Sequence, residues 1–136
     1  MVVVVGLLAI FLIPRDALNT IHLQTAAAKV QNDLHYAKEL AITTNTNCGV
    51  SFEANGSYTV YQQSLLTPAV NPLTQQPYVI DIGQLFKNIR IQNTVRIEFD
   101  PTGKPVLGGG LTVQVSSPQS ALSLYVTPNT GLIQQL

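Results

Sequence analysis

The chain has few charged residues, a single cysteine and no tryptophan. The first two features limit which binding partners and covalent cross-links can be expected. Charged residues make up 10% of the 136 residues, with seven basic residues balanced by seven acidic ones. This neutral, charge-poor composition gives no electrostatic reason to expect nucleic acid or an anionic membrane surface as a partner. Cys48 has no second cysteine with which to form an intrachain disulfide, so the redox compartment cannot be inferred from it.

Proline and glycine are missing from residues 17–47, whereas they are frequent after this stretch. Apolar residues recur within it at steps of three and four, which places them on one stripe of an α-helix. The helix is predicted to continue to about residue 43, with its stripe covering a sheet. Polar residues such as Asp33, Lys38 and Glu39 lie between the apolar positions, where water can solvate them. The predicted helix-to-sheet core residues are Leu23, Ala27, Val30, Leu34, Ala37 and Ala41.

Residues 1–13 form an uncharged, almost wholly apolar run that precedes this helix. Joined to it, the run would give a helix of roughly 60 Å, longer than a domain of this size is wide, so we expect the apolar part to protrude. The run is shorter than the ~20 residues that span a bilayer, and it lacks the basic start of a signal peptide. Two alternatives stay open, a buried core helix or an apolar run that is incomplete because Met1 is an internal start.

The chain is therefore predicted to have two parts, a hydrophobic segment over residues 1–15 and a globular domain over residues 16–136. The hydrophobic segment is expected to pack in a membrane or in the core of a filament, and Pro14 is expected to kink the helix. The predicted packing residues of this segment are Val2, Val3, Val4, Val5, Leu7, Leu8, Ile10, Phe11, Leu12 and Ile13.

Beyond residue 43 the apolar period changes from that of a helix to the two-residue alternation of strands. Asn55-Gly56 is typical of a tight hairpin turn in which both central residues have positive φ. The prolines within residues 64–77 predict a long surface loop. Strands are predicted over residues 48–53, 58–61, 78–82, 89–91, 95–99, 111–115, 122–126 and 132–133. One long helix followed by antiparallel strands predicts an α+β domain in which the helix covers the sheet.

Several short motifs follow one another along the chain: Leu7–Ile10 with Ile13-Pro14, Leu34–Ile42 with Asn45, Val50–Phe52, Ile97–Gly103 and Leu124–Gly131. Their order and spacing resemble those of type IV pilin-like proteins, and within that class the minor pseudopilins of the GspH/FimT type. The resemblance implies a pilin-like fold and a structural subunit rather than an enzyme. It implies other pilin or pseudopilin subunits as partners through the N-terminal helix. It also implies a single-pass inner-membrane protein whose globular domain lies on the periplasmic side.

The chain departs from the family pattern in two places. The family's basic leader, its peptidase site and the glutamate near the mature start have no counterpart here. Processing by the prepilin peptidase is therefore expected for the family but cannot be assigned to a residue. Members thought to bind DNA carry arginines in the final strand region, whereas residues 131–136 carry no positive charge. We therefore do not expect DNA as a partner.

The two histidines offer little for a metal site, and no metal or cofactor is expected. His22 and His35 are about 220° apart around a helix, so their side chains cannot bind the same metal ion. His35 shares a helix face with Asp33 and Glu39. A metal site requires more ligands and supporting residues around them, so a solvated helix face explains this group better.

No pattern in the sequence indicates catalysis. Glu98 and Asp100 lie on one face of a predicted strand that runs into a turn, and we expect both carboxylates to face solvent. General acid–base chemistry would require a pocket and a shifted pKa, which the sequence does not indicate. Cys48 is expected to be a small buried side chain.

Three classes of function remain. The leading hypothesis is a structural subunit of a type II secretion pseudopilus or a type IV pilus. The second is a competence-type pseudopilin that binds DNA for uptake, with Lys87, Arg90 and Arg96 as the candidate basic cluster. The third is a soluble α+β enzyme or ligand-binding protein whose helix is wholly buried.

Overall fold

The computed structural model describes residues 15–136, with side chains described from Ile21 onward. The packing residues predicted between Val2 and Ile13, and the kink predicted at Pro14, lie outside the described residues. The elements in chain order are α2 (Arg15–Thr44), β1 (Cys48–Phe52), β2 (Ser57–Gln62), β3 (Ser64–Pro68), β4 (Val79–Asp81), α3 (Ile82–Leu85), β5 (Arg90–Ile91), β6 (Val95–Phe99), β7 (Pro105–Leu107), β8 (Thr112–Ser116), β9 (Ala121–Val126) and β10 (Ile133–Gln135).

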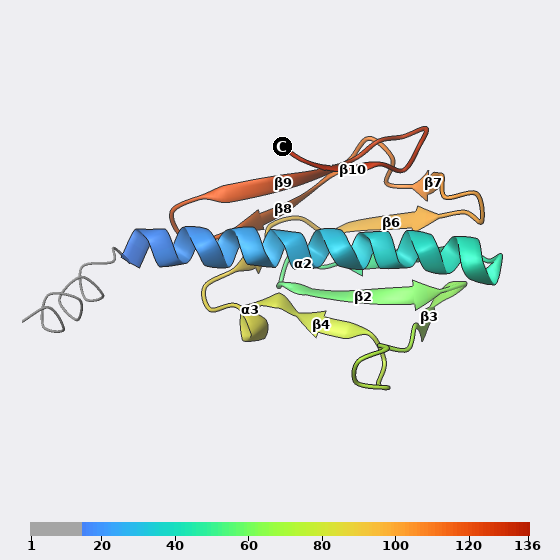
Figure 1. The fold of residues 1–136 in the computed structure, drawn as a ribbon, viewed down its shortest axis with the longest axis horizontal. Coiled ribbons are helices and arrows are strands. Elements are labelled where there is room, and N and C mark those ends of the chain that lie inside the picture. The colour runs from blue at the N-terminus through green and yellow to red at the C-terminus, as the bar shows by residue number, and fades with distance from the viewer. Residues whose placement is uncertain (1–14) are drawn as a thin grey trace, which may run out of the picture.

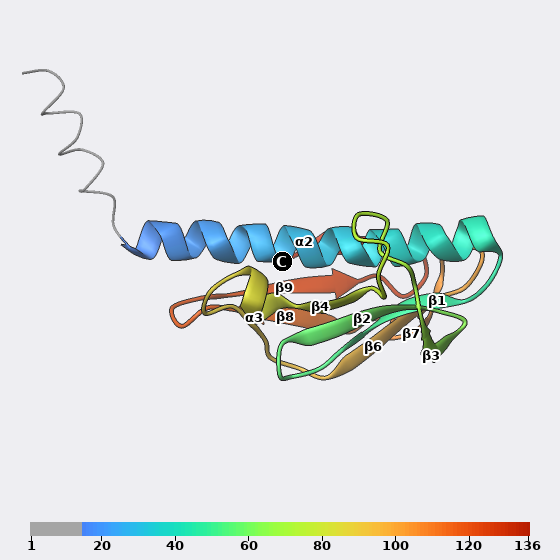
Figure 2. The same ribbon diagram turned by 90° about the horizontal axis from the view of Figure 1, so that it is seen from below.

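A long helix followed by antiparallel strands confirms the predicted α+β class. The strands form two sheets. In the first sheet the order is β3-β2-β1-β6-β7, with β4 also paired to β2, and in the second it is β10-β9-β8-β5. Figures 1 and 2 show α2 lying along the length of the domain, with both sheets on the same side of it.

The long helix α2 follows from a stretch that contains neither proline nor glycine. It ends where Asn45 adopts a left-handed backbone conformation with a φ of 54°. Asparagine tolerates this conformation better than most residues and is a common residue just after a helix C-terminus. The Thr44 hydroxyl donates a hydrogen bond to the Leu40 carbonyl at 2.6 Å, so a side chain supplies a partner for one of the last helical carbonyls.

The hydrophobic core lies between α2 and the two sheets. Alternate residues of β1 and β6 point toward the helix, as the two-residue period of a strand requires. In the first sheet the fully buried core residues include Cys48, Val50, Phe52, Val60, Ile97 and Phe99. In the second sheet they include Ile91, Val113, Val115, Leu124 and Val126. A large apolar side chain buried in this way contributes about 1.5–3 kcal/mol, so this interface holds the helix on the domain.

The hairpin between β1 and β2 forms as predicted, but its turn is of a different type. The Gly56 amide donates to the Glu53 carbonyl at 3.0 Å, and the Glu53 amide donates to the Ser57 carbonyl at 2.9 Å. Gly56 has a φ of 100°, whereas Asn55 is not among the residues with positive φ. The prediction of positive φ at both turn residues was therefore wrong. Asn55 instead accepts a hydrogen bond from the Ser57 amide through its side chain, at 2.9 Å.

The prediction of a long loop over residues 64–77 was also wrong in part. Ser64–Pro68 forms β3, and Val70 and Pro77 form an isolated bridge beyond it. Proline lacks the amide donor of a sheet ladder, but at an edge strand that donor is not needed. The same reasoning accounts for β7, which begins at Pro105 at the opposite edge and was not predicted.

The strand predicted over residues 78–82 is shorter because a helical turn follows it. Asp81 closes β4, and its carboxylate accepts a hydrogen bond from the Gly83 amide at 3.0 Å. An aspartate in this position caps a helix N-terminus, so Ile82 is the first residue of α3. Ile82 is fully buried, which anchors the turn beside the sheet.

Candidate functional site

The long helix α2 has one face buried against the sheets and one face open. Leu23 is 2% exposed, and the other predicted core residues (Ala27, Val30, Leu34, Ala37 and Ala41) are 0% exposed. Outside this stripe, Ile21 and Ile42 are 54% and 44% exposed. The chain's own sheets therefore cover the apolar stripe of α2. In residues 15–136 no helix combines the length and the apolarity that crossing a membrane requires.

Asp33 belongs to the buried side of α2, which corrects the expectation that water solvates it. Asp33 is only 3% exposed. Its carboxylate oxygens accept hydrogen bonds from the hydroxyls of Tyr58 and Tyr78, both at 2.5 Å. Lys29, one helical turn earlier, places its ammonium 3.0 Å from the same carboxylate. Burial, followed by the interactions with Asp33, raises the pKa of both tyrosine hydroxyls far above the ordinary value. We call these four residues the Asp33 cluster.

Glu98 is also buried, at 8% exposed, so the expectation that it faces solvent was wrong. The Tyr61 hydroxyl donates to its carboxylate at 2.7 Å, and an Arg96 guanidinium nitrogen lies 3.1 Å from the same oxygen. The Nε of Arg96 donates to the Tyr61 oxygen at 2.8 Å. Glu98, Tyr61 and Arg96 form the Glu98 cluster, on the face of the first sheet that points away from α2. Burial raises the pKa of Tyr61, and the hydrogen bond from Arg96 opposes that rise.

Gly49 makes room for the Glu98 cluster. It is the cross-strand partner of both Tyr61 and Glu98. A Cβ atom at this position would lie 2.7 Å from the Tyr61 hydroxyl and 2.3 Å from the Ile97 carbonyl oxygen. Only glycine therefore lets the tyrosine hydroxyl lie across β1 and reach the carboxylate.

Asp100 does not join Glu98 in a paired-carboxylate site. Its side chain accepts hydrogen bonds from the Thr102 hydroxyl at 2.5 Å and from the amides of Thr102 and Lys104 at 2.9 and 3.0 Å. These bonds, that of the Thr102 hydroxyl first, lower the pKa of the Asp100 carboxyl. Asp100 therefore stabilises the turn between β6 and β7 as an ionised carboxylate.

The histidines and the cysteine are not brought together. His22 is exposed and His35 is half-buried on α2, while Cys48 is buried at the start of β1. Across residues 15–136 no group of three potential metal ligands is found. The Cys48 thiol lies 3.6 Å from the Thr46 hydroxyl and packs as a small core side chain.

The three basic residues of the DNA hypothesis are not equivalent. Arg96 is engaged by Glu98 and Tyr61, and its guanidinium carbon lies 4.9 Å from the centroid of the Tyr61 ring. Lys87 and Arg90 are exposed, and among the described residues neither side chain has a hydrogen-bond or ion-pair partner. The cluster therefore offers two free cations rather than three.

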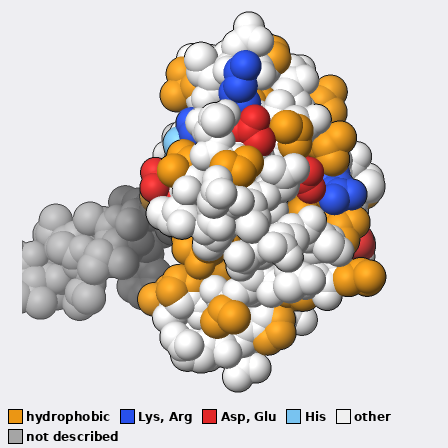
Figure 3. All heavy atoms as spheres, turned by 90° about the vertical axis from the view of Figure 1, so that its right-hand side faces the viewer, with side chains coloured by type: hydrophobic (Ala, Val, Ile, Leu, Met, Phe, Trp, Pro, Cys, Tyr) orange, Lys and Arg blue, Asp and Glu red, His pale blue; other side chains and the backbone are white. Residues whose placement is uncertain are grey.

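Two edges of the domain expose apolar side chains that belong to uncharged stretches of the sequence. No charged residue lies between Glu53 and Asp81 or after Lys104. In the first of these stretches Leu66 and Leu73 are 93% and 91% exposed. In the second, Val106, Leu107 and Leu111 are 43–50% exposed. Figure 3, which views the end of the molecule where α2 finishes, shows few charged side chains among apolar and uncharged polar ones.

Comparison with protein families and solved structures agrees with this geometry. The family model described as Type II transport protein GspH matches residues 26–131. Two crystal structures of the type IV minor pilin FimU of Pseudomonas aeruginosa have similar folds. One aligns with a TM-score of 0.59 and 14% identity over 83% of this chain and 91% of that chain. The other gives 0.61 and 15% over 90% and 92%. No curated protein sequence matches the chain.

Proposed function

Because this chain belongs to the GspH family of type II transport proteins, we propose that it is a minor pseudopilin or pilin subunit that assembles through its N-terminal helix. The observation that carries the proposal is the arrangement of α2. Its apolar stripe is fully buried on the chain's own sheets, and its N-terminal end extends past the strands in Figures 1 and 2. The apolar residues 1–13 precede that end directly in the sequence.

The apolar residues 1–13 are proposed to hold the subunit in the inner membrane before assembly, with the globular domain on the periplasmic side. In the filament, the same residues would pack against the N-terminal helices of neighbouring subunits. Within a hydrocarbon or filament core, the four consecutive valines starting at Val2 lose less than they would in a short soluble helix, where β-branched residues are unfavourable. The filament would be a type II secretion pseudopilus or a type IV pilus.

Membrane fractionation of two forms of the chain tests this proposal. The full chain is expected in the membrane fraction, whereas a chain that begins at Asn19 is expected to be soluble and monomeric. Leu8→Asp in the full chain should release it from membranes, because a carboxylate in the apolar run raises the free energy of insertion by about 2.5–3.5 kcal/mol. Gln24→Asp, on the exposed face of α2, is the matched control and should leave fractionation unchanged.

Assembly is tested separately in cells that carry the secretion or pilus machinery. The full chain is expected in the filament fraction released by shearing, and Leu8→Asp should remove it from that fraction while Gln24→Asp does not. Equal solubility of the full and shortened chains would contradict the anchoring role. Membrane insertion without recovery in sheared filaments would contradict the assembly role.

A further inference from the structure

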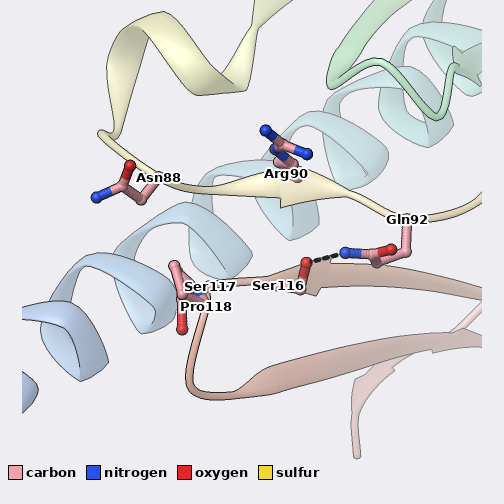
Figure 4. Close-up of a pocket in the computed structure, with 6 residues that line it drawn as sticks. All are labelled: Asn88, Arg90, Gln92, Ser116, Ser117 and Pro118. Atoms are coloured by element: carbon pink, nitrogen blue, oxygen red, sulfur yellow. Dashed lines mark hydrogen bonds between the residues drawn. The ribbon is translucent and has the colours of Figure 1, made fainter.

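A polar cleft opens on the second sheet, on the side that faces away from the hydrophobic core. It encloses about 300 Å³ and is lined by Asn88, Arg90, Gln92, Ser116, Ser117 and Pro118. Figure 4 shows Arg90 on β5 with Asn88 before this strand and Gln92 after it, and it shows Ser116 at the end of β8 with Ser117 just beyond.

The strand alternation explains why these residues share one face. Arg90 is the register partner of Ser116 in the antiparallel pair of β5 and β8. Ile89 and Ile91 are 2% and 0% exposed because they point into the core. The residues between and beside them therefore point to the opposite face, and they are the ones that line the cleft.

The cleft presents hydrogen-bond donors without any carboxylate among its lining residues. The side chains of Arg90 and Asn88 have no hydrogen-bond partner within residues 15–136. Ser116 is 7% exposed, and its oxygen accepts a hydrogen bond from the Gln92 amide. The hydroxyl proton of Ser116 is thereby left to donate to another group. Lys87, next to Asn88 in the chain, is exposed and is a second cation whose side chain has no hydrogen-bond or ion-pair partner among the described residues.

We propose that this cleft binds a carboxylate presented by an acidic peptide segment of a partner protein. An arginine guanidinium beside an amide and a hydroxyl matches the planar, two-oxygen geometry of a carboxylate, which it can bind through two parallel hydrogen bonds. The inference goes beyond assembly through the N-terminal helix and does not depend on it.

Duplex DNA fits the cleft less well than a carboxylate does. Non-specific binding to a duplex requires several cations spread over successive phosphates. Here only Lys87 and Arg90 are free in this region, because Arg96 is bound to Glu98 and Tyr61 in the first sheet. The volume is also at the lower end of the range for ligand sites, which suits a single anionic group.

Fluorescence anisotropy with the full chain in nonionic detergent tests the carboxylate site. The probe is a fluorescein-labelled peptide, Gly-Ser-Glu-Glu-Ser-Gly, and its Gln-Gln counterpart is the uncharged control probe. The Glu-Glu peptide is expected to bind more tightly than the Gln-Gln peptide. Arg90→Gln should weaken binding of the Glu-Glu peptide about tenfold, since a charge-assisted bidentate pair is lost. Arg90→Lys should also weaken it, because an ammonium lacks the planar fork.

Lys104→Gln is the matched control, because it removes an exposed cation and changes the net charge by the same amount at a distant turn. Its effect on binding of the Glu-Glu peptide should stay below about twofold. Equal effects of Arg90→Gln and Lys104→Gln would overturn the proposal, since they would show attraction to net charge rather than a site. Equal binding of both peptides, or displacement by a 20-base-pair duplex at the same concentration as unlabelled Glu-Glu peptide, would also overturn it.

Discussion

The Asp33 and Glu98 clusters each stabilise a buried carboxylate, and they lie on opposite faces of the first sheet. In each cluster the carboxylate accepts from at least one tyrosine hydroxyl and has one basic side chain as counter-ion. Asp33 lies between α2 and the sheet and receives two tyrosine hydroxyls, whereas Glu98 lies on the outer face and receives one. The basic partner of Asp33 is on the same helix, whereas that of Glu98 is two residues away on the same strand.

The difference between the clusters lies in which groups depend on the carboxylate. The hydroxyls of Tyr58 and Tyr78 both donate to the Asp33 carboxylate. Tyr61, in contrast, donates to Glu98 and also accepts from Arg96, whose side chain is 39% exposed. Removal of Asp33 therefore leaves two buried hydroxyl donors without an acceptor, whereas removal of Glu98 leaves one, the Tyr61 hydroxyl. The first cluster should matter more for stability.

The largest effect is expected for Asp33→Ala. The substitution leaves two buried hydroxyls without an acceptor, and it should lower the free energy of unfolding by about 3–5 kcal/mol. Urea denaturation of the chain that begins at Asn19 measures the change. Asn32→Ala, at the exposed neighbouring position, is the control and should change stability by less than about 0.5 kcal/mol. Similar effects of the two substitutions would show that Asp33 does not hold the helix to the sheet.

Glu98→Ala should have a smaller effect, about 1–3 kcal/mol, because the Tyr61 oxygen keeps its hydrogen bond from Arg96. The same denaturation experiment measures it, with the exposed Glu53→Ala as the matched control. A loss as large as that of Asp33→Ala would contradict the proposed difference between the clusters.

The sequence predicted the apolar side of the helix–sheet interface but not its polar groups. The stripe from Leu23 to Ala41 follows from helical periodicity, which depends on neighbours within two turns. The burial of Asp33 depends on Tyr58 and Tyr78, which lie 25 and 45 residues further along the chain. No local pattern in the sequence identifies such distant partners. Helical periodicity alone therefore predicts that a charged residue between apolar positions is solvated by water.

The edge strands and the cleft could not be predicted, because both depend on which strands pair with each other. The prolines within residues 64–77 predict a loop, and β7 is not predicted at all, because the sequence does not show which strands lie at an edge and can tolerate a missing amide. Arg90 is one of three candidate cations of the alternative DNA-binding hypothesis, and only the pairing of β5 with β8 places it opposite Ser116. The predictions for residues 1–14 lie outside the described residues and stay predictions.

Alkaline pH should reveal the buried tyrosines. Burial and the interactions with Asp33 raise the pKa of Tyr58 above its unfolded value, so the folded chain keeps this proton longer than the unfolded chain does. The stabilising contribution is complete below about pH 10 and falls above it by about 1.4 kcal/mol per pH unit for each such tyrosine. Urea denaturation from pH 8 to 11.5 should therefore show falling stability, with a shallower fall in Tyr58→Phe. An unchanged slope in this variant would contradict the assignment.

The smallest effect is expected for Lys29→Ala. Its ammonium lies 3.0 Å from Asp33, but the side chain is 29% exposed, so water screens the pair and can replace it. Asp33 would keep both tyrosine donors, and the free energy of unfolding should fall by less than about 1 kcal/mol. Arg96→Ala should cost more than Lys29→Ala, because it removes both the ion pair with Glu98 and the Nε donor to Tyr61. Urea denaturation of the two variants side by side decides the order. A larger loss for Lys29→Ala would show that the ion pair stabilises the buried aspartate more than the tyrosine hydroxyls do.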